Sequence, residues 1–90
     1  MITAVLVGNI WATRKADSLG GYKMMLAKVL GSSNKRDEIM VVVDTIGAGI
    51  GDRVIITTGS SARKMLGNDN LPIDASVVGI VDEDCHLNLD

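Results

Sequence analysis

The chain has 90 residues, of which 47% are apolar, and its formal net charge is −2. A chain of this length forms one small domain, and its slightly acidic balance argues against a nucleic-acid-binding surface, which normally needs a basic excess. Its single cysteine, Cys85, excludes an intrachain disulfide and a thiolate metal cage. Because Phe is absent and Trp11 and Tyr22 are the only aromatics, the core must be built from aliphatic side chains.

The opening segment "MITAVLVGNIW" has no charged n-region, so it is not typical of a signal peptide. No apolar run approaches the roughly 20 residues that a membrane-spanning helix needs. We therefore expect a cytoplasmic protein without membrane contact.

Five apolar runs rich in β-branched residues follow one another, separated by Gly, Ser, Asn and Asp. They are Ile2–Trp11, Tyr22–Leu30, Ile39–Asp44, Arg53–Thr58 and Ala75–Asp82. Short runs with such punctuation are typical of strands in a small barrel or sandwich. The runs "IMVVV" and "VIITT" are apolar on both faces of a strand, so one face would fill the barrel and the other would need a cover. A neighbouring subunit is the expected cover.

The segment "GSSARKMLG" interrupts the strand pattern. Ser60 is a good N-cap residue, helix formers follow it, and Gly67 is a good residue to end a helix. We expect about two turns of helix here. Pro72 then favours an extended chain at the preceding residue.

The loop "DTIGAGIGD" carries Gly47, Gly49 and Gly51 between two predicted strands. A phosphate-binding loop would need backbone N–H groups at the start of a helix, whereas a β-branched strand follows here, and the lysine of a P-loop is missing. We expect an architectural loop, in which the glycines adopt positive φ or let another backbone come close. In an oligomer, that backbone could belong to a neighbouring subunit.

Candidates for catalysis and metal binding are weak. Cys85 and His86 form a small constellation on a charged terminus, for which a solvated tail is the simpler explanation. Ser60 and Ser61 with His86 would make a nucleophile and base, but "GSSAR" is not a nucleophile elbow. Asp44, Asp74 and Asp82 each stand at a strand end, where turn and cap roles are expected.

Arg63 is the charge with two open interpretations. It is either an exposed helix arginine or a clamp at a subunit interface, because arginine suits forked hydrogen bonds to carbonyl and carboxylate oxygens.

Three motifs in order carry a resemblance to a known family. They are D-x-[IV]-G-A-G-x-G in "DTIGAGIG", then "GSSAR", then V-x-G-I-V-D in "VVGIVD". With "VLVGNIWATRK" and "LGGYKMMLAKV" they make the chain resemble the bacterial microcompartment vertex proteins of the EutN/CcmL family, from about Met1 to Glu83. The departures are small: Met24 and Met25 stand where the family often has Leu, and Asp52 where Glu is common.

The resemblance implies an all-β fold, a small five-stranded OB-like β-barrel with one short helix, over residues 1–90 as a single domain. It implies homopentamers that cap the five-fold vertices of a shell in the cytoplasm, alongside hexameric shell proteins, with no catalytic, cofactor or metal site. The positions that match the family motifs, and are therefore interface candidates, are Asp44, Gly47, Ala48, Gly49, Gly51, Ser60, Ser61, Arg63 and Asp82.

Two other functions stay open at this point. An OB-like barrel can bind single-stranded nucleic acid, but this chain has few aromatic residues for stacking bases. A small hydrolase would need a base beside a nucleophile, and no such pair is evident.

Overall fold

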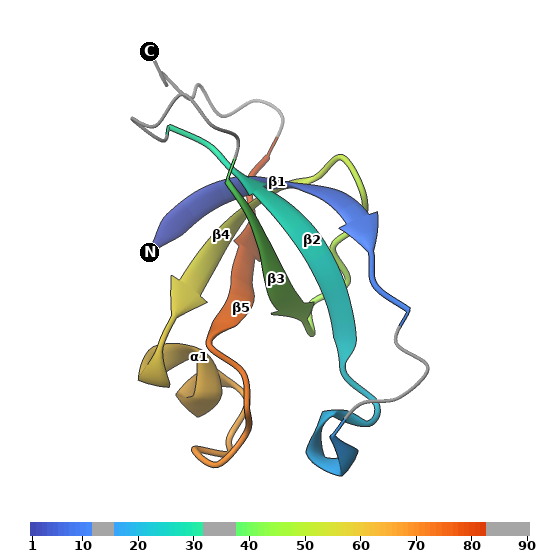
Figure 1. Ribbon diagram of the computed structural model, residues 1–90. Coiled ribbons are helices and arrows are strands. Elements are labelled where there is room, and N and C mark those ends of the chain that lie inside the picture. The colour runs from blue at the N-terminus through green and yellow to red at the C-terminus, as the bar shows by residue number, and fades with distance from the viewer. Residues whose placement is uncertain (12–15, 32–37, 83–90) are drawn as a thin grey trace.

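A computed structural model describes residues 1–11, 16–31 and 38–82, and its strands form one closed barrel (Figure 1). The elements in chain order are β1 (Ile2–Asn9), a 3-10 helix (Asp17–Leu19), β2 (Lys23–Val29), β3 (Ile39–Asp44), β4 (Arg53–Thr58), α1 (Ser60–Met65) and β5 (Ala75–Ile80). The predicted all-β fold with five strands and one short helix is confirmed. Within the described residues, no helix is long and apolar enough to cross a lipid bilayer.

The barrel closes in the strand order β1-β2-β3-β5-β4. Neighbouring strands are antiparallel except at the β3–β5 seam, which is parallel and joined by the single pair Val43 and Ser76. A parallel pair needs a long crossover connection, and here the glycine loop, β4 and α1 supply it.

The predicted strand boundaries are correct for β3 and β4 and too generous elsewhere. The first predicted run reached Trp11, but β1 ends at Asn9, and the last reached Asp82, but β5 ends at Ile80. Just beyond each of these ends the chain keeps one more backbone hydrogen bond to the neighbouring strand, from Ile10 to Met24 and from Val81 to Arg53, without continuing as a strand. The 3-10 helix was not predicted, since three residues give no periodic signal.

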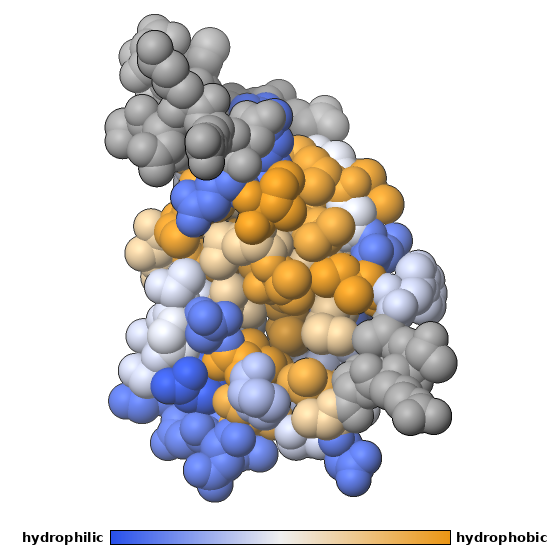
Figure 2. Space-filling view, viewed as in Figure 1, coloured by the Kyte–Doolittle hydropathy of each residue, from blue (hydrophilic) through white to orange (hydrophobic). Residues whose placement is uncertain are grey.

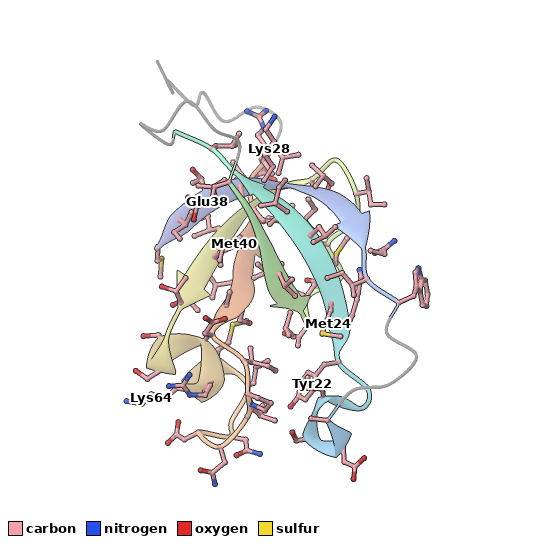
Figure 3. The ribbon with its side chains drawn as sticks, in the orientation of Figure 1. Tyr22, Met24, Lys28, Glu38, Met40 and Lys64 are labelled. Carbon is pink, nitrogen blue, oxygen red and sulfur yellow. The ribbon has the colours of Figure 1, made fainter. Side chains whose placement is uncertain are left out.

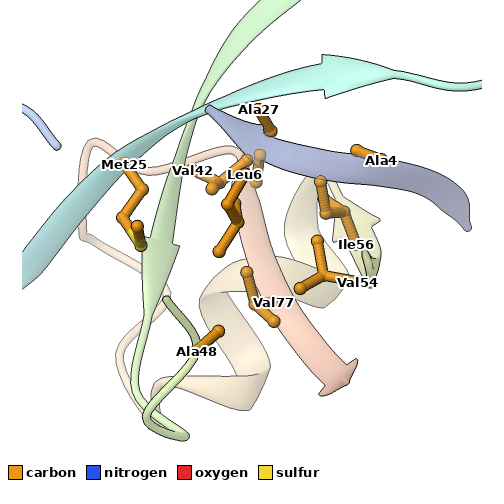
Figure 4. Packing of buried hydrophobic residues seen from close by; sticks show 10 residues of the cluster. Ala4, Leu6, Met25, Ala27, Val42, Ala48, Val54, Ile56 and Val77 are labelled. Atoms are coloured by element: carbon orange, nitrogen blue, oxygen red, sulfur yellow. The ribbon is translucent and has the colours of Figure 1, made fainter. Parts of the chain in front are cut away.

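Aliphatic side chains fill the barrel interior, as the composition required (Figure 4). The buried cluster consists of Ala4, Leu6, Met25, Ala27, Val42, Ala48, Val54, Ile56, Ala75 and Val77. Alternate residues of each strand contribute, because successive side chains of a strand point to opposite faces. Small alanines among the larger side chains let five short strands close around a narrow interior.

A second cluster lies outside the barrel and covers part of its outer surface. Val43, Leu71 and Ile73 are buried there, and partly buried neighbours pack against them. Tyr22 and Met24, at the lower end of β2 in Figure 3, are two of these neighbours. The chain between α1 and β5 therefore covers one end of the outer face of β3, a role that the sequence interpretation gave to a neighbouring subunit.

The rest of that outer face is open. Ile39 and Val41 of β3 are each 50% exposed, and Val41 is paired with Leu26 of β2. Paired residues of antiparallel strands point to the same side, so these three side chains form one apolar surface, which we call the strand face. Figure 2 shows the apolar area over these strands. Lys28 and Glu38 lie at its upper end (Figure 3).

Candidate assembly interface

The glycine loop, residues 45–52, runs from the end of β3 past β1 to the start of β4. Its last residues are held on β1: the Gly51 N–H donates to the Leu6 carbonyl at 2.8 Å, and the Leu6 N–H donates to the Asp52 carbonyl at 3.0 Å. The β1–β2 pairing shifts register between Leu6 and Gly8. The loop is thus bonded to β1 beside this irregular point of the ladder.

Two of the three loop glycines have the predicted backbone. Gly47 has a φ of +84° and Gly51 a φ of +93°, a region that side chains disfavour. For Gly49 the positive-φ alternative is wrong, and the other alternative, close approach by the backbone of a neighbouring subunit, stays a prediction. Gly49 does not have positive φ, and an added Cβ would lie 3.9 Å from the nearest atom, Asp52 Oδ2. Its N–H donates to that same oxygen at 2.8 Å, a bond that any residue except proline could make.

Asp44 has the turn role expected of a strand-end aspartate. The Ile46 N–H donates to its Oδ1 at 3.2 Å, and the Lys23 ammonium donates to its Oδ2 at 3.1 Å. Lys23 also donates to the Ala48 carbonyl. The sequence interpretation missed Lys23. Its only signal was the pairing of Lys23 with Asp44 across β2 and β3, and this becomes visible once the strand register is known.

Ala48 anchors the loop, and two isoleucines project from it. The Ala48 side chain is buried in the barrel core (Figure 4). Ile46 and Ile50, on either side of it, are 42% and 61% exposed. We call these two side chains the loop surface. A loop that buries one small residue and exposes two large apolar ones is suited to contact another protein.

Helix α1 begins differently from the prediction. Gly59 is the N-cap residue, with a φ of 68°, and Ser60 is the first helical residue, with no side-chain cap hydrogen bond. The chain favours glycine at this position because the residue has a positive φ. In this conformation the Gly59 N–H donates a hydrogen bond to the Asp74 carbonyl at 2.8 Å. Ser60 and Ser61 are both exposed. The predicted helix end is confirmed: Gly67, with a φ of +78°, follows the C-cap residue Leu66.

Arg63 bonds within its own subunit. Its Nη1 donates to the Ile73 carbonyl at 3.1 Å and so ties α1 to the chain entering β5. It is therefore neither a freely exposed helix arginine nor, in this contact, a clamp between subunits. Asp74, the third strand-end acid, is exposed and uses its backbone carbonyl toward Gly59.

The candidate residues fall at two ends of β4. The glycine loop leads into Arg53, and Asp82, which is exposed, follows Val81, whose N–H donates to the Arg53 carbonyl at 2.8 Å. The serine and arginine motif follows the other end of the strand. Six strand residues separate these groups, a span of roughly 20 Å. The motifs therefore form two separate regions of the surface.

In the part of the chain that the structure describes, no group of three His, Cys, Asp or Glu side chains could hold a metal ion. Cys85 and His86 lie outside the described residues. The metal-site and hydrolase interpretations that used them therefore stay without structural support.

Comparison with known proteins identifies the family. The model of the family described as "Ethanolamine utilisation protein EutN/carboxysome" matches residues 1–82. The chain belongs to the EutN/CcmL family. Its resemblance to that family, inferred from three motifs, is confirmed.

Individual members are similar over nearly their whole length. The microcompartment shell vertex protein GrpN of Rhodospirillum rubrum is 45% identical over 83 residues, which are 91% of this chain and 93% of GrpN. The carboxysome shell vertex protein CcmL of Synechocystis sp. is 37% identical over 91% of this chain and 83% of its own. A solved structure described as the GrpN pentameric microcompartment shell protein from Rhodospirillum rubrum matches with a TM-score of 0.79 and 39% identity, covering 97% of this chain and all of that one.

Proposed function

We propose that this chain is a structural subunit of a bacterial microcompartment shell, in which five copies form a ring at a five-fold vertex and allow the polyhedral shell to close. The observation that carries the proposal is membership of the EutN/CcmL family over residues 1–82. Relatives that share the chain almost end to end are shell vertex proteins, and one is a pentamer. The same relatives support a structural role rather than an enzymatic one.

The subunit offers two apolar surfaces for such a ring. The strand face lies on the outer side of β2 and β3, and the loop surface lies on the loop that is bonded to β1. In a closed ring, each subunit presents one surface to the neighbour on one side and a different surface to the other. The proposed interface joins the strand face of one subunit to the loop surface of the next, and covers Ile39, Val41, Ile46 and Ile50.

The family motifs take different parts in this interface. The glycine loop, with Asp44, Gly47, Ala48, Gly49 and Gly51, shapes the loop surface. Ser60, Ser61 and Asp82 are exposed and stay candidates for contacts with a neighbour. Arg63 acts indirectly, because its bond to Ile73 holds the cover of the second cluster in place.

The proposed function is positional. A sheet of hexagonal units is flat, and it closes into a polyhedron only where five-fold units replace hexagonal ones at the corners. We propose that this ring meets hexameric shell proteins of another family at those corners. A vertex subunit needs shape and complementary surfaces, and it needs no reactive group.

The nucleic-acid alternative gains no support from the fold. Each stacked base contributes about 1–3 kcal/mol, which requires exposed aromatic platforms. Tyr22 packs against the second cluster, which leaves Trp11 as the one exposed aromatic of the two in the chain.

Native mass spectrometry tests the proposal directly. At micromolar subunit concentration we expect a particle of about five times the 9.5 kDa subunit mass. A stable monomer or dimer would overturn the ring, and a hexamer would overturn the five-fold vertex.

A further inference from the structure

The glycine loop depends on one charged group from another strand. Lys23, the first residue of β2, is paired with Asp44, the last residue of β3. Its ammonium donates both to Asp44 Oδ2 at 3.1 Å and to the carbonyl of Ala48. One side chain therefore joins the residue before the loop to a residue in the middle of it.

This pair differs from an ordinary surface ion pair. The Asp44 side chain is fully buried, while the Lys23 side chain is 45% exposed. Exposed pairs contribute little, but a buried carboxylate that loses its cation is left in a poorly solvating environment. Asp44 also accepts the Ile46 N–H, so a movement of its carboxylate affects the backbone of the loop.

The two halves of the loop are held by different contacts. Residues after Ala48 are fixed by two hydrogen bonds between Gly49 and Asp52 and by the bonds that join Gly51 and Asp52 to Leu6 of β1. The half from Thr45 to Ala48 is bracketed by the Lys23 ammonium, with the exposed Ile46 between the two bonded residues. The Lys23 contacts thus help to fix the position of Ile46, together with the buried Ala48 side chain and the bond from the Ile46 N–H to Asp44.

We propose that Lys23 is an electrostatic latch, which holds the first half of the glycine loop in the shape that a neighbouring subunit contacts. Neutralising this one ammonium group therefore loosens the loop and weakens the ring, while the barrel stays folded. The part of this inference that concerns the ring rests on the proposed function. The part that concerns the loop does not.

The test is Lys23→Met, which removes the charge and keeps a chain of similar length, with Lys64→Met as the matched control. Lys64 is exposed on α1 (Figure 3), and its loss changes the net charge by the same amount. Hydrogen exchange measured residue by residue should show the Ile46 amide of Lys23→Met exchanging at least about tenfold faster than in the control. The Val42 and Ala27 amides of the barrel should stay well protected and exchange far more slowly than the Ile46 amide in both variants, because they exchange only when the barrel itself opens.

Native mass spectrometry of the same samples measures the stability of the ring independently of the loop. The Lys23→Met ring should dissociate at subunit concentrations about tenfold or more above those at which the Lys64→Met ring dissociates. Unchanged exchange at Ile46 would overturn the latch whatever the oligomeric state. Monomers in every sample, with fast exchange at Ile46 in Lys23→Met alone, would overturn the proposed function and leave the latch supported.

The unmodified protein provides a second measurement in case Lys23→Met does not fold. An ammonium group held by two acceptors exchanges its protons with water more slowly than a free one. The Nζ–H signal of Lys23 in a nitrogen-15 correlation spectrum should persist at a temperature where that of Lys64 is lost. Simultaneous loss of both signals would overturn the latch.

Discussion

At the scale of single residues, the backbone decides which glycines the loop needs. An L side chain in the left-handed region costs roughly 1–2 kcal/mol, and Gly47 and Gly51 both lie there. Gly49 lies outside that region and has room for a Cβ within the subunit. A need for glycine at this position would therefore come from the approach of a neighbouring chain.

Substitution by alanine separates these two cases. Gly51→Ala should lower the free energy of unfolding by roughly 1–2 kcal/mol, because the chain must hold a Cβ at positive φ. Gly49→Ala should change it by less than about 0.5 kcal/mol. Denaturation of the two variants by urea, at concentrations where both are dissociated, measures the difference. Equal losses in the two variants would show that the loop is constrained in another way.

The role of Asp44 could be predicted from the sequence, and the role of Lys23 could not. A strand-end aspartate predicts a turn, and the bond from the Ile46 N–H confirms it. Lys23 could not be predicted, because its two partners are 21 and 25 residues away along the chain and the strand register brings them together. For Ser60, the cap prediction is wrong because Gly59, one residue earlier, supplies the positive φ of the turn.

At the scale of elements, the hydrophobic pattern was sufficient to predict the strands. It was insufficient to predict the second cluster, which covers part of their outer surface. The β-branched runs of β3 and β4 predict their boundaries, since dense Val, Ile and Thr favour strands and polar loops end them. The second cluster could not be predicted. The residues between α1 and β5 have no regular period, and their contact with Val43 depends on the fold as a whole.

A charge on the strand face is expected to prevent assembly without unfolding the subunit. Val41→Asp places a carboxylate at a half-exposed position of β3, where water solvates it in the monomer. In the ring the same carboxylate would be buried without a partner, at a cost of several kcal/mol. Native mass spectrometry should then show monomers, with a circular dichroism spectrum like that of the parent protein.

Asn70→Asp is the matched control for this variant. It adds the same charge at an exposed position of the segment between α1 and β5. We expect its ring to be intact. Rings that persist in Val41→Asp would exclude the strand face from the interface, and rings lost in both variants would point to net charge as the cause.

At the scale of the whole molecule, the proposed function predicts that shells formed without this chain are misshapen. Cells that make the hexameric shell proteins without this chain should form elongated, open or leaky shells, because no five-fold unit closes the corners. The chemistry of the enclosed enzymes should be intact after the cells are broken. Electron microscopy of purified shells and assays on lysates measure the two effects.

The variants described above serve as controls for that experiment. Returning Asn70→Asp to the deletion strain should restore closed shells, and returning Val41→Asp should not. Regular, sealed polyhedra in the deletion strain would refute the vertex role, provided that no second member of the family is present.

The β3–β5 seam has a mechanical consequence. The other seams of the barrel are hydrogen-bonded ladders of several residue pairs, whereas Val43 and Ser76 form the single pair between β3 and β5. The side chains of the second cluster, which slide more easily than hydrogen-bonded strands, lie against Val43 beside this seam. A subunit wedged between neighbours would deform there first, by a small opening of the barrel rather than by breaking a ladder. In the proposed vertex, such a subunit would be stiff around most of its circumference and compliant along one line, which would let a corner of the shell absorb small changes of angle between the facets that meet at it.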